Sequence, residues 1–503
     1  MNFTVTGISV ETEGMTAEQL EQAKIFSGKN AGICYMKDSY FNSAVTDPDK
    51  ALTRFSSTCK NAHHSIADHI QVEVLLEGVS KMLAIVLNSL QDYSTSEKSG
   101  RYTVMTGNSD REVKLYNKWK DIFRLRLLEI NPSMDDVMLM KLMAKAGHDD
   151  VIVTNGRLDN NSMADYDDEH KHVLAECKKD ISLPSVKLAQ ENARYVLSVF
   201  TRSTTMGYST SLRQWNYIYD WCQKYMSQYM PRYDENYVKS MTSDGKEGKV
   251  AIVYKGSDTE VSFFERELYF DFLKLSNFIF ETMYIPELRD TKDRHFSFLV
   301  GLSGQKDDEL IGYDLSCFEP NGYTGEYEYD ETTHSSDDSL GMSYNVAYTA
   351  SFVHIAQAER HRTLKYFMYF NPRHNNPEYF IPPMLRGTHY EDEWLKDLKS
   401  VEDIIPQATK VCIVETGFIG DFLLKCEERL CSRAQYEVMN QTKLTAMRFV
   451  DAIHNKEITN NVCVNFVKKF ADIEKGQCYT KCKITGQCNE ACKRVNEALS
   501  RLY

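Results

Sequence analysis

One order of sequence features occurs twice in this chain, once in each half. In the first half, apolar residues at helical spacing from Val79 to Leu87 lead to a polar cluster at residues 94–102. In the second half, a similar apolar run over residues 353–356 leads to a basic cluster at residues 360–362. After each cluster we expect a strand-rich stretch and then a second helix, at residues 212–222 and 418–438. Because the order recurs, we interpret the chain as a duplicated fold, although few residues are identical between the halves.

Length and composition agree with two packed domains. A chain of 503 residues is too long for one hydrophobic core. Its hydrophobic fraction of 42% and charged fraction of 26% are ordinary for a folded soluble protein. A polar segment with two glycines at residues 242–249 divides the chain near its midpoint. We therefore predict two α+β domains, residues 1–243 and 249–455, followed by a short helical, Cys-rich tail at residues 456–503.

Charge and cysteine usage restrict the partners and the compartment. The formal net charge is −13, with acidic residues spread along the chain. No basic block is present to attract phosphates, so we expect binding to neither nucleic acid nor an anionic membrane, while a small anionic substrate stays possible. The first residues lack a basic region followed by an apolar run, so we expect no signal peptide, and no apolar stretch is long enough to cross a bilayer. Thirteen cysteines without a secretion signal predict reduced thiols in a cytoplasmic protein.

The polar cluster of the first half contains three consecutive residues that can converge on one anion. Ser99 offers a hydroxyl, Gly100 allows close backbone approach, and Arg101 offers a planar fork suited to phosphate oxygens. Taken alone, the cluster is more simply a solvated loop at a helix end with a capping serine.

The basic cluster of the second half, Arg360-His361-Arg362, could hold a diphosphate at a helix end. Its simpler interpretation is a charged face that pairs with nearby acids such as Glu359. Two further arginines, Arg194 and Arg429, stand alone in expected helices, where an arginine is more often a surface residue.

Together these clusters resemble the flavin-dependent thymidylate synthases, which carry the motif R-H-R-x-x-S-x-N-E-x-S-x-R-Y and an upstream H-x-S-x-x-E-H. In the first half, Ser94 to Tyr102 resembles the later part of the long motif, with Ser96 in place of the asparagine. His63 to His69 resembles the upstream element, with Asp68 in place of the glutamate. The R-H-R positions, however, fall on Ser89-Leu90-Gln91.

The second half resembles the family in the complementary parts. Arg360-His361-Arg362 matches R-H-R, but the S-x-R-Y portion is absent after it. Residues 415–437 are similar to the C-terminal signature of the family, with its uracil-facing arginine at Arg429. In the first half that arginine falls on Cys222. The resemblance covers most of residues 20–445, apart from a poorly matched stretch between Lys255 and Asp330.

Complementary loss implies one composite active site, because the family builds its site where subunits meet. The second half would supply Gln357, Arg360, His361, Arg362 and Arg429. The first half would supply Glu97, Lys98, Ser99, Gly100, Arg101 and Arg194. Each half has lost the elements that only a second site would need.

The resemblance implies a methyltransferase that converts dUMP to dTMP with 5,10-methylenetetrahydrofolate, NADPH and FAD. Arg429 would be the catalytic residue that stabilises negative charge on the uracil ring. Gln357, Arg360 and residues 97–101 with Arg194 would bind the nucleotide. FAD would contact Arg360, His361, Arg362 and Arg213, and His69 would pack against the folate. Since the family forms tetramers of single domains, a fused pair is expected to be a homo-oligomer such as a dimer.

Two other functions remain open at this point. The same site could make a different 5-substituted nucleotide, such as 5-hydroxymethyl-dUMP, if water completed the reaction. The chain could also be a non-catalytic nucleotide-binding or assembly protein that keeps only the fold.

The tail contains four closely spaced cysteines, Cys478, Cys482, Cys488 and Cys492. Four thiolates could bind zinc tetrahedrally, and the neighbouring lysines would favour the thiolate form. The spacing is not the familiar C-x2-C pattern, so a helical hairpin without metal is the favoured interpretation.

Overall fold

A computed structural model describes most of the chain. The described residues are 14–36, 46–100, 103, 109–159, 166–229, 262–290, 312–313, 343–370, 377–430 and 434–455. Both the predicted boundary at residues 242–249 and the predicted tail at 456–503 lie outside these ranges. Contacts divide the chain into two compact units, each drawing on two segments: Met1–Glu97 with Thr204–Gly304, and Lys98–Ser203 with Gln305–Tyr503. Helices and small antiparallel sheets occur in both, which is compatible with the predicted α+β class.

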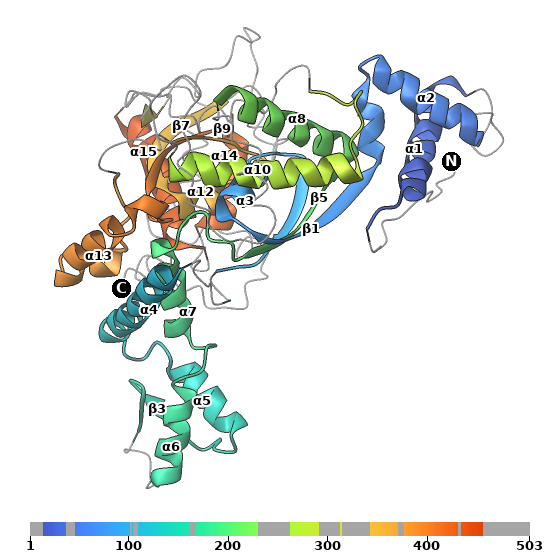
Figure 1. Cartoon of the computed structure of the whole chain (residues 1–503). Coiled ribbons are helices and arrows are strands. Elements are labelled where there is room, and N and C mark those ends of the chain that lie inside the picture. Colours follow the sequence, from blue (N-terminus) through green and yellow to red (C-terminus); the bar gives the residue numbers. More distant parts are fainter. Residues whose placement is uncertain are drawn as a thin grey trace, which may run out of the picture. The chain divides into compact units, whose positions relative to one another are not determined.

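Unit 1 consists of one small sheet with helices. Its elements are α1 (Ala17–Gly32), η1 (Ile33–Tyr35), α2 (Pro48–Lys60), η4 (His64–His69), β1 (Gln71–Val79), α3 (Lys81–Asn88), β2 (Tyr93–Glu97), β5 (Thr204–Ser211), α8 (Leu212–Tyr229) and α10 (Phe263–Thr282). The strands pair antiparallel in the order β1-β5-β2. Figure 1 shows α3, α8 and α10 beside this sheet.

The core of unit 1 lies between the sheet and these three helices. Every residue of α3 is buried, which agrees with the apolar run that predicted this helix. Ser80 caps α3: its hydroxyl oxygen accepts from the Leu83 amide and its hydroxyl donates to Asp271 of α10 at 2.5 Å. Further out, α1 and α2 cross closely at Gly28, where a Cβ would lie 2.0 Å from the carbonyl oxygen of Ala51.

Unit 2 contains a second small sheet and more helices. Its first segment carries α4 (Asp110–Ile130), α5 (Asp136–Lys145), β3 (Val153–Thr154), β4 (Arg157–Leu158), α6 (Asp168–Cys177), α7 (Pro184–Ala193) and η5 (Arg194–Val196). Its second segment carries β6 (Gly312–Tyr313), β7 (Ser343–Ser351), α12 (Phe352–Ala358), β8 (Lys365–Tyr369), η8 (Pro383–Leu385), α13 (His389–Lys399), η9 (Glu402–Ile404), β9 (Lys410–Phe418), α14 (Ile419–Arg429) and α15 (Tyr436–His454). The larger sheet is antiparallel in the order β6-β7-β9-β8.

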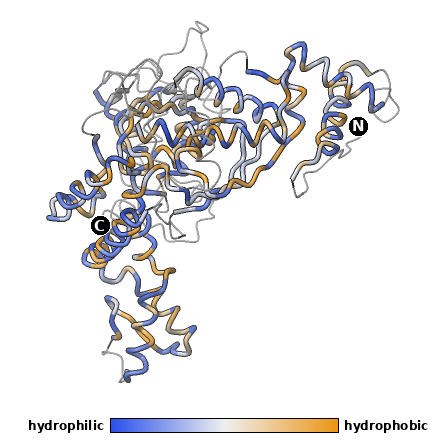
Figure 2. Tube along the Cα trace, viewed as in Figure 1, coloured by the Kyte–Doolittle hydropathy of each residue, from blue (hydrophilic) through white to orange (hydrophobic). Residues whose placement is uncertain are grey.

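One hydrophobic cluster joins the two segments of unit 2. Along α4, Trp119 and Phe123 recur at helical spacing and meet Trp394 of α13, with ring centroids 4.7 and 5.4 Å away from that of Trp394. Figure 2 shows that α4 also carries hydrophilic residues along its length, as expected for a helix with one buried face. The same cluster includes Tyr195 of η5 and Val353 of α12. Residues far apart in the sequence therefore share one core.

The two sheets share an order of elements. In unit 1 the chain runs β1–α3–β2 and later β5–α8, and in unit 2 it runs β7–α12–β8 and later β9–α14. In each sheet the last of these strands lies between the other two. A further helix, α10 or α15, packs on both helices in each case. Ser351 caps α12 as Ser80 caps α3.

Several local predictions can be compared with this fold. Helices α3, α12 and α8 are confirmed, but the single helix expected at residues 418–438 is wrong, because α14 ends at Arg429 and α15 begins at Tyr436. The loop interpretation of residues 94–97 is also wrong, since they form β2 and pair with β5. The stretch between β2 and β5 is mostly helical rather than strand-rich. Among the described residues, no helix is both long and apolar enough to span a membrane.

Candidate functional site

The basic cluster follows a short buried helix of unit 2. Helix α12 ends at Ala358, and a turn closed by the Leu364 amide donating to the His361 carbonyl at 3.1 Å leads into β8. His361 is buried, Arg360 is half-buried and Arg362 is exposed. Gln357, in the last turn of α12, is half-buried. Three predicted flavin residues, Arg360, His361 and Arg362, and the predicted nucleotide residues Gln357 and Arg360 thus lie within six consecutive positions.

His361 is held neutral. Burial first, then the charges of Arg429 and Lys425, lower its pKa to about 2. Its Nδ1 lies 3.3 Å from Glu428 Oε2, and its Nε2 is buried without a hydrogen-bond partner among the described residues. The positive charge of the site therefore comes from the arginines, while the imidazole offers an open hydrogen-bonding atom.

Arg429 is the last residue of α14, which begins directly after β9. It is half-buried, and its charge acts on His361. The equivalent helix of unit 1, α8, has Cys222 at the same distance from its start: ten residues separate Leu212 from Cys222 and Ile419 from Arg429. Cys222 is buried, and burial raises the pKa of its thiol to about 12.

A buried polar network lies beneath this cluster, and sequence reasoning missed it. Lys425 Nζ and Glu415 Oε2 are 2.6 Å apart, and both side chains are 1% exposed. Tyr348 donates its hydroxyl to the same carboxylate oxygen at 2.8 Å and lies 3.0 Å from His354 Nε2. In the sequence, the only indication of this network was that Lys425 stands within the apolar face of α14.

Arg194 is buried in unit 2. The arginine is 3% exposed, and among the described residues its Nε and Nη2 have no hydrogen-bond partner. Its surface interpretation is therefore wrong. An arginine buried with open donors is costly, because its lost hydration is not replaced. Such a side chain is a candidate ligand for an anion.

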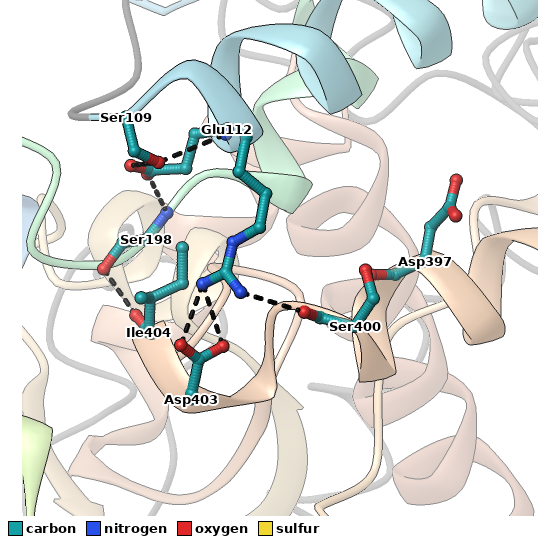
Figure 3. Close-up of polar contacts among 8 residues, drawn as sticks. Ser109, Glu112, Ser198, Asp397, Ser400, Asp403 and Ile404 are labelled. Atoms are coloured by element: carbon teal, nitrogen blue, oxygen red, sulfur yellow. Dashed lines mark hydrogen bonds and ion pairs between the residues drawn. The ribbon is translucent and has the colours of Figure 1, made fainter.

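Backbone pairing fixes the segment that carries Arg194. Ala408 donates its amide to the Tyr195 carbonyl at 2.9 Å, and Gln407 donates to the Leu197 carbonyl at 2.8 Å. Figure 3 shows the next contacts along the chain: the Ser198 amide donates to Glu112 Oε1 at 2.9 Å and its hydroxyl donates to the Ile404 carbonyl at 2.5 Å. Arg111, next to Glu112 in α4, donates to Asp403 and to the Ser400 carbonyl. This first-half segment thus belongs structurally with the second segment of unit 2.

The polar cluster near residue 99 is partly described. Ser99 is half-buried, Gly100 is buried and Lys98 is exposed. The Ser99 carbonyl accepts hydrogen bonds from the Thr103 amide at 3.1 Å and the Thr103 hydroxyl at 2.7 Å. Arg101 lies outside the described residues. Contacts assign residues 98–203 to unit 2.

Glu97 ends β2 in unit 1, where α3 already engages its carboxylate. Lys81 pairs with it, the two side chains being 7% and 2% exposed, and the Asn88 amide donates to it at 3.4 Å. Sixteen residues separate Lys81 from Glu97 in the sequence, so only the packing of α3 on β2 reveals the pair.

Arg213 and His69 also belong to unit 1. Arg213 pairs with Asp68 at 2.8 Å and lies over the Tyr217 ring, 5.8 Å from its centroid. Burial raises the pKa of Asp68, and the Arg213 charge opposes this. His69 is exposed at the end of η4. The Asp68 that replaces the family's glutamate therefore still faces a cation.

The predicted zinc ligands, Cys478, Cys482, Cys488 and Cys492, lie outside the described residues. Within the described ranges, no group of three or more His, Cys, Asp or Glu residues is arranged to hold a metal ion.

Comparison with known proteins gives one match. The family model "Thymidylate synthase complementing protein" matches residues 22–229, which is less than half of the chain. That family is flavin-dependent, so the match supports a flavin-dependent thymidylate synthase-like function in general terms. The matched range includes His69, residues 94–102, Arg194 and Arg213. No curated protein matches the chain. No solved structure matches it either.

Proposed function

We propose that this chain methylates dUMP to dTMP at one composite site, with its phosphate-binding arginine drawn from the first half and its R-H-R cluster from the second. The observation that carries the proposal is Arg194, buried with open donors in the same compact unit as Arg360, His361 and Arg429. The family match covers Arg194 but not the other three residues.

The shared element order supports a duplication behind this division. Ser89 follows the capping Ser80 by nine residues, and Arg360 follows the capping Ser351 by nine residues. The position of the first R-H-R arginine is therefore a serine in unit 1 and an arginine in unit 2. The Cys222 and Arg429 positions repeat this contrast at the second helix.

Unit 1 could not regain its own uracil-facing arginine easily. Cys222 is 2% exposed and lies against Ser276 of α10. A guanidinium at this position would have to be buried without a carboxylate partner or displace α10. In unit 1 this position is therefore occupied by a buried, packed thiol, whereas in unit 2 the same position carries the charged Arg429.

The residues of unit 2 fit a flavin dinucleotide. The half-buried Arg360 and the exposed Arg362, on either side of buried His361, carry donors of the kind that a diphosphate accepts. FAD, reduced at the expense of NADPH, would supply the electrons for methylation, and 5,10-methylenetetrahydrofolate would supply the carbon. Arg360, His361 and Arg362 would hold the cofactor.

The remaining residues would position dUMP. Arg194 and the Ser99–Gly100 segment would hold the phosphate, which would fix uracil C5 in place. Arg429 stays protonated at any working pH, so it can stabilise negative charge on the ring as the one-carbon unit is transferred. Gln357 would contact the nucleotide from α12. We further propose a homo-oligomer such as a dimer, and a cytoplasmic location.

Purified protein tests this proposal in two steps. The absorbance spectrum should contain flavin bands, and incubation with dUMP, methylenetetrahydrofolate and NADPH should give a product with the mass of dTMP. A product heavier by one oxygen would identify 5-hydroxymethylation instead. Colourless protein that takes up no FAD would refute the proposal and favour a non-catalytic binding protein.

A further inference from the structure

Tyr195, the residue directly after Arg194, is tied to the second half through its hydroxyl. The side chain is fully buried and stacks on Phe380, with ring centroids 4.9 Å apart. Its hydroxyl donates to Glu437 Oε2 at 2.8 Å and accepts from Gln435 Nε2 at 2.5 Å. Both partners stand at the start of α15.

The same carboxylate holds the start of α12. Glu437 Oε1 accepts from the Ser351 amide at 2.8 Å, and Oε2 accepts from the Ser351 hydroxyl at 2.6 Å. Ser351 in turn caps α12 by accepting from the His354 amide at 3.2 Å. Because α12 has only seven residues, fixing its first turn also fixes the position of Arg360 and His361 just beyond its end.

We propose that Tyr195 and Glu437 are positioning residues that set Arg194 at a fixed distance from the Arg360-His361-Arg362 cluster, so that a nucleotide phosphate and a flavin are held in register. This inference rests on the proposed function. Arg194 has no hydrogen-bond partner at Nε or Nη2 among the described residues, so its place depends on the neighbours that hold its backbone. Tyr195 is the nearest of these neighbours in sequence.

Core packing does not account for the Tyr195 hydroxyl, and this hydroxyl takes part in helix capping only through Gln435, whose Oε1 accepts from the Val438 amide at 3.3 Å at the start of α15. A phenylalanine would fill the same space and stack on Phe380 without bringing a polar atom into the core. A carboxylate beneath the capping serine occurs in unit 1 as well, where Asp271 takes the Ser80 hydroxyl. Helix capping therefore explains why a carboxylate lies at Glu437. The Tyr195 hydroxyl itself caps no helix.

Tyr195→Phe tests the inference, with Tyr208→Phe as the matched control. Tyr208 is also fully buried, and its hydroxyl donates to the Leu87 carbonyl at 2.8 Å in unit 1. The probes are FAD content per chain, melting temperature, dUMP affinity of the FAD-loaded protein by calorimetry, and kcat against KM for dUMP. We expect Tyr195→Phe to weaken dUMP binding and raise KM about tenfold while FAD content and kcat stay close to wild type. Tyr208→Phe should lower the melting temperature to a similar extent and leave dUMP affinity unchanged.

A second variant keeps the test decisive if Tyr195→Phe folds poorly. Glu437→Leu, which removes the acceptor of the Tyr195 hydroxyl, should weaken dUMP binding in the same way, and the effects of the two substitutions should be less than additive, since both remove the Tyr195–Glu437 contact. Wild-type dUMP affinity in Tyr195→Phe, or an equal loss in Tyr208→Phe, would overturn the inference alone. Wild-type protein that binds neither FAD nor dUMP would overturn the proposed function and this inference together.

Discussion

Replacing Lys425 by methionine removes one partner of the buried ion pair beneath the basic cluster. The pair has an Nζ–Oε2 distance of 2.6 Å and side chains that are 1% exposed, so neither charge can turn to water when its partner is lost. Breaking such a pair costs about 3–5 kcal/mol. That is a large share of the roughly 5–15 kcal/mol that stabilises a typical protein. Because the slope of the unfolding free energy against urea is steep for a chain of this size, about 3–4 kcal/mol/M, we expect the urea unfolding midpoint of Lys425→Met to fall by about 1 M.

Two further variants separate this effect from loss of volume. In the double variant Lys425→Met/Glu415→Gln the uncompensated charge is removed while Tyr348 keeps an acceptor, so at least half of the lost stability should return. Lys118→Met is the surface control: Lys118 contacts Asp397 at 2.5 Å and Glu393 at 2.7 Å but is 35% exposed. Its loss should cost less than about 1 kcal/mol.

Urea denaturation of the wild type, Lys425→Met, the double variant and Lys118→Met tests whether the stranded Glu415 charge causes the loss of stability. The reasoning is refuted if the double variant is no more stable than Lys425→Met, because a stranded Glu415 charge would then not be the cause. It is equally refuted if Lys118→Met loses as much stability as Lys425→Met.

The other predictions concern the site itself. Arg194→Met should weaken dUMP binding about a hundredfold while leaving thermal stability unchanged or higher, since two buried donors without partners are removed; a marked fall in melting temperature would contradict this. Arg429→Ala should nearly abolish methylation yet keep its flavin absorbance, and loss of flavin would show that the role is wrongly assigned. The pKa of His361, about 2 in the folded protein, lies below its unfolded value, so its contribution to stability is complete above pH 6.5 and is lost as the pH falls below that value. Wild type should therefore lose about 2 kcal/mol more than His361→Gln between pH 7 and pH 5 in urea titrations, and parallel losses would contradict the buried neutral imidazole.

Local apolar patterns predicted several elements of the fold. The runs at residues 79–87 and 353–356 gave α3 and α12 because every turn of these helices faces a core. The break between α14 and α15 has no glycine or proline to mark it. It is set by tertiary contacts instead, since Glu437 at the start of α15 is held by Ser351 and Tyr195. A single sequence carries no signal for such a contact.

Some residues of the candidate site could likewise be predicted from the sequence, and others could not. Arg360, His361 and Arg429 could be named from the sequence because their residue types resemble a motif. Long-range pairs such as Lys425–Glu415 could not be named, because an ion pair depends on which strand a helix packs against. β2 was mistaken for a loop since its Ser-Thr-Ser sequence is polar, and its pairing with β5 is visible only in the fold.

The number of flavins bound per chain tests the composite site most directly. FAD released from the purified, FAD-saturated protein should be quantified against protein concentration determined by amino-acid analysis. One composite site predicts one FAD per chain, and Arg360→Ala should reduce this to none. Two FAD per chain, or one that persists in Arg360→Ala, would contradict the account, because a flavin would then be held without the R-H-R cluster of the second half.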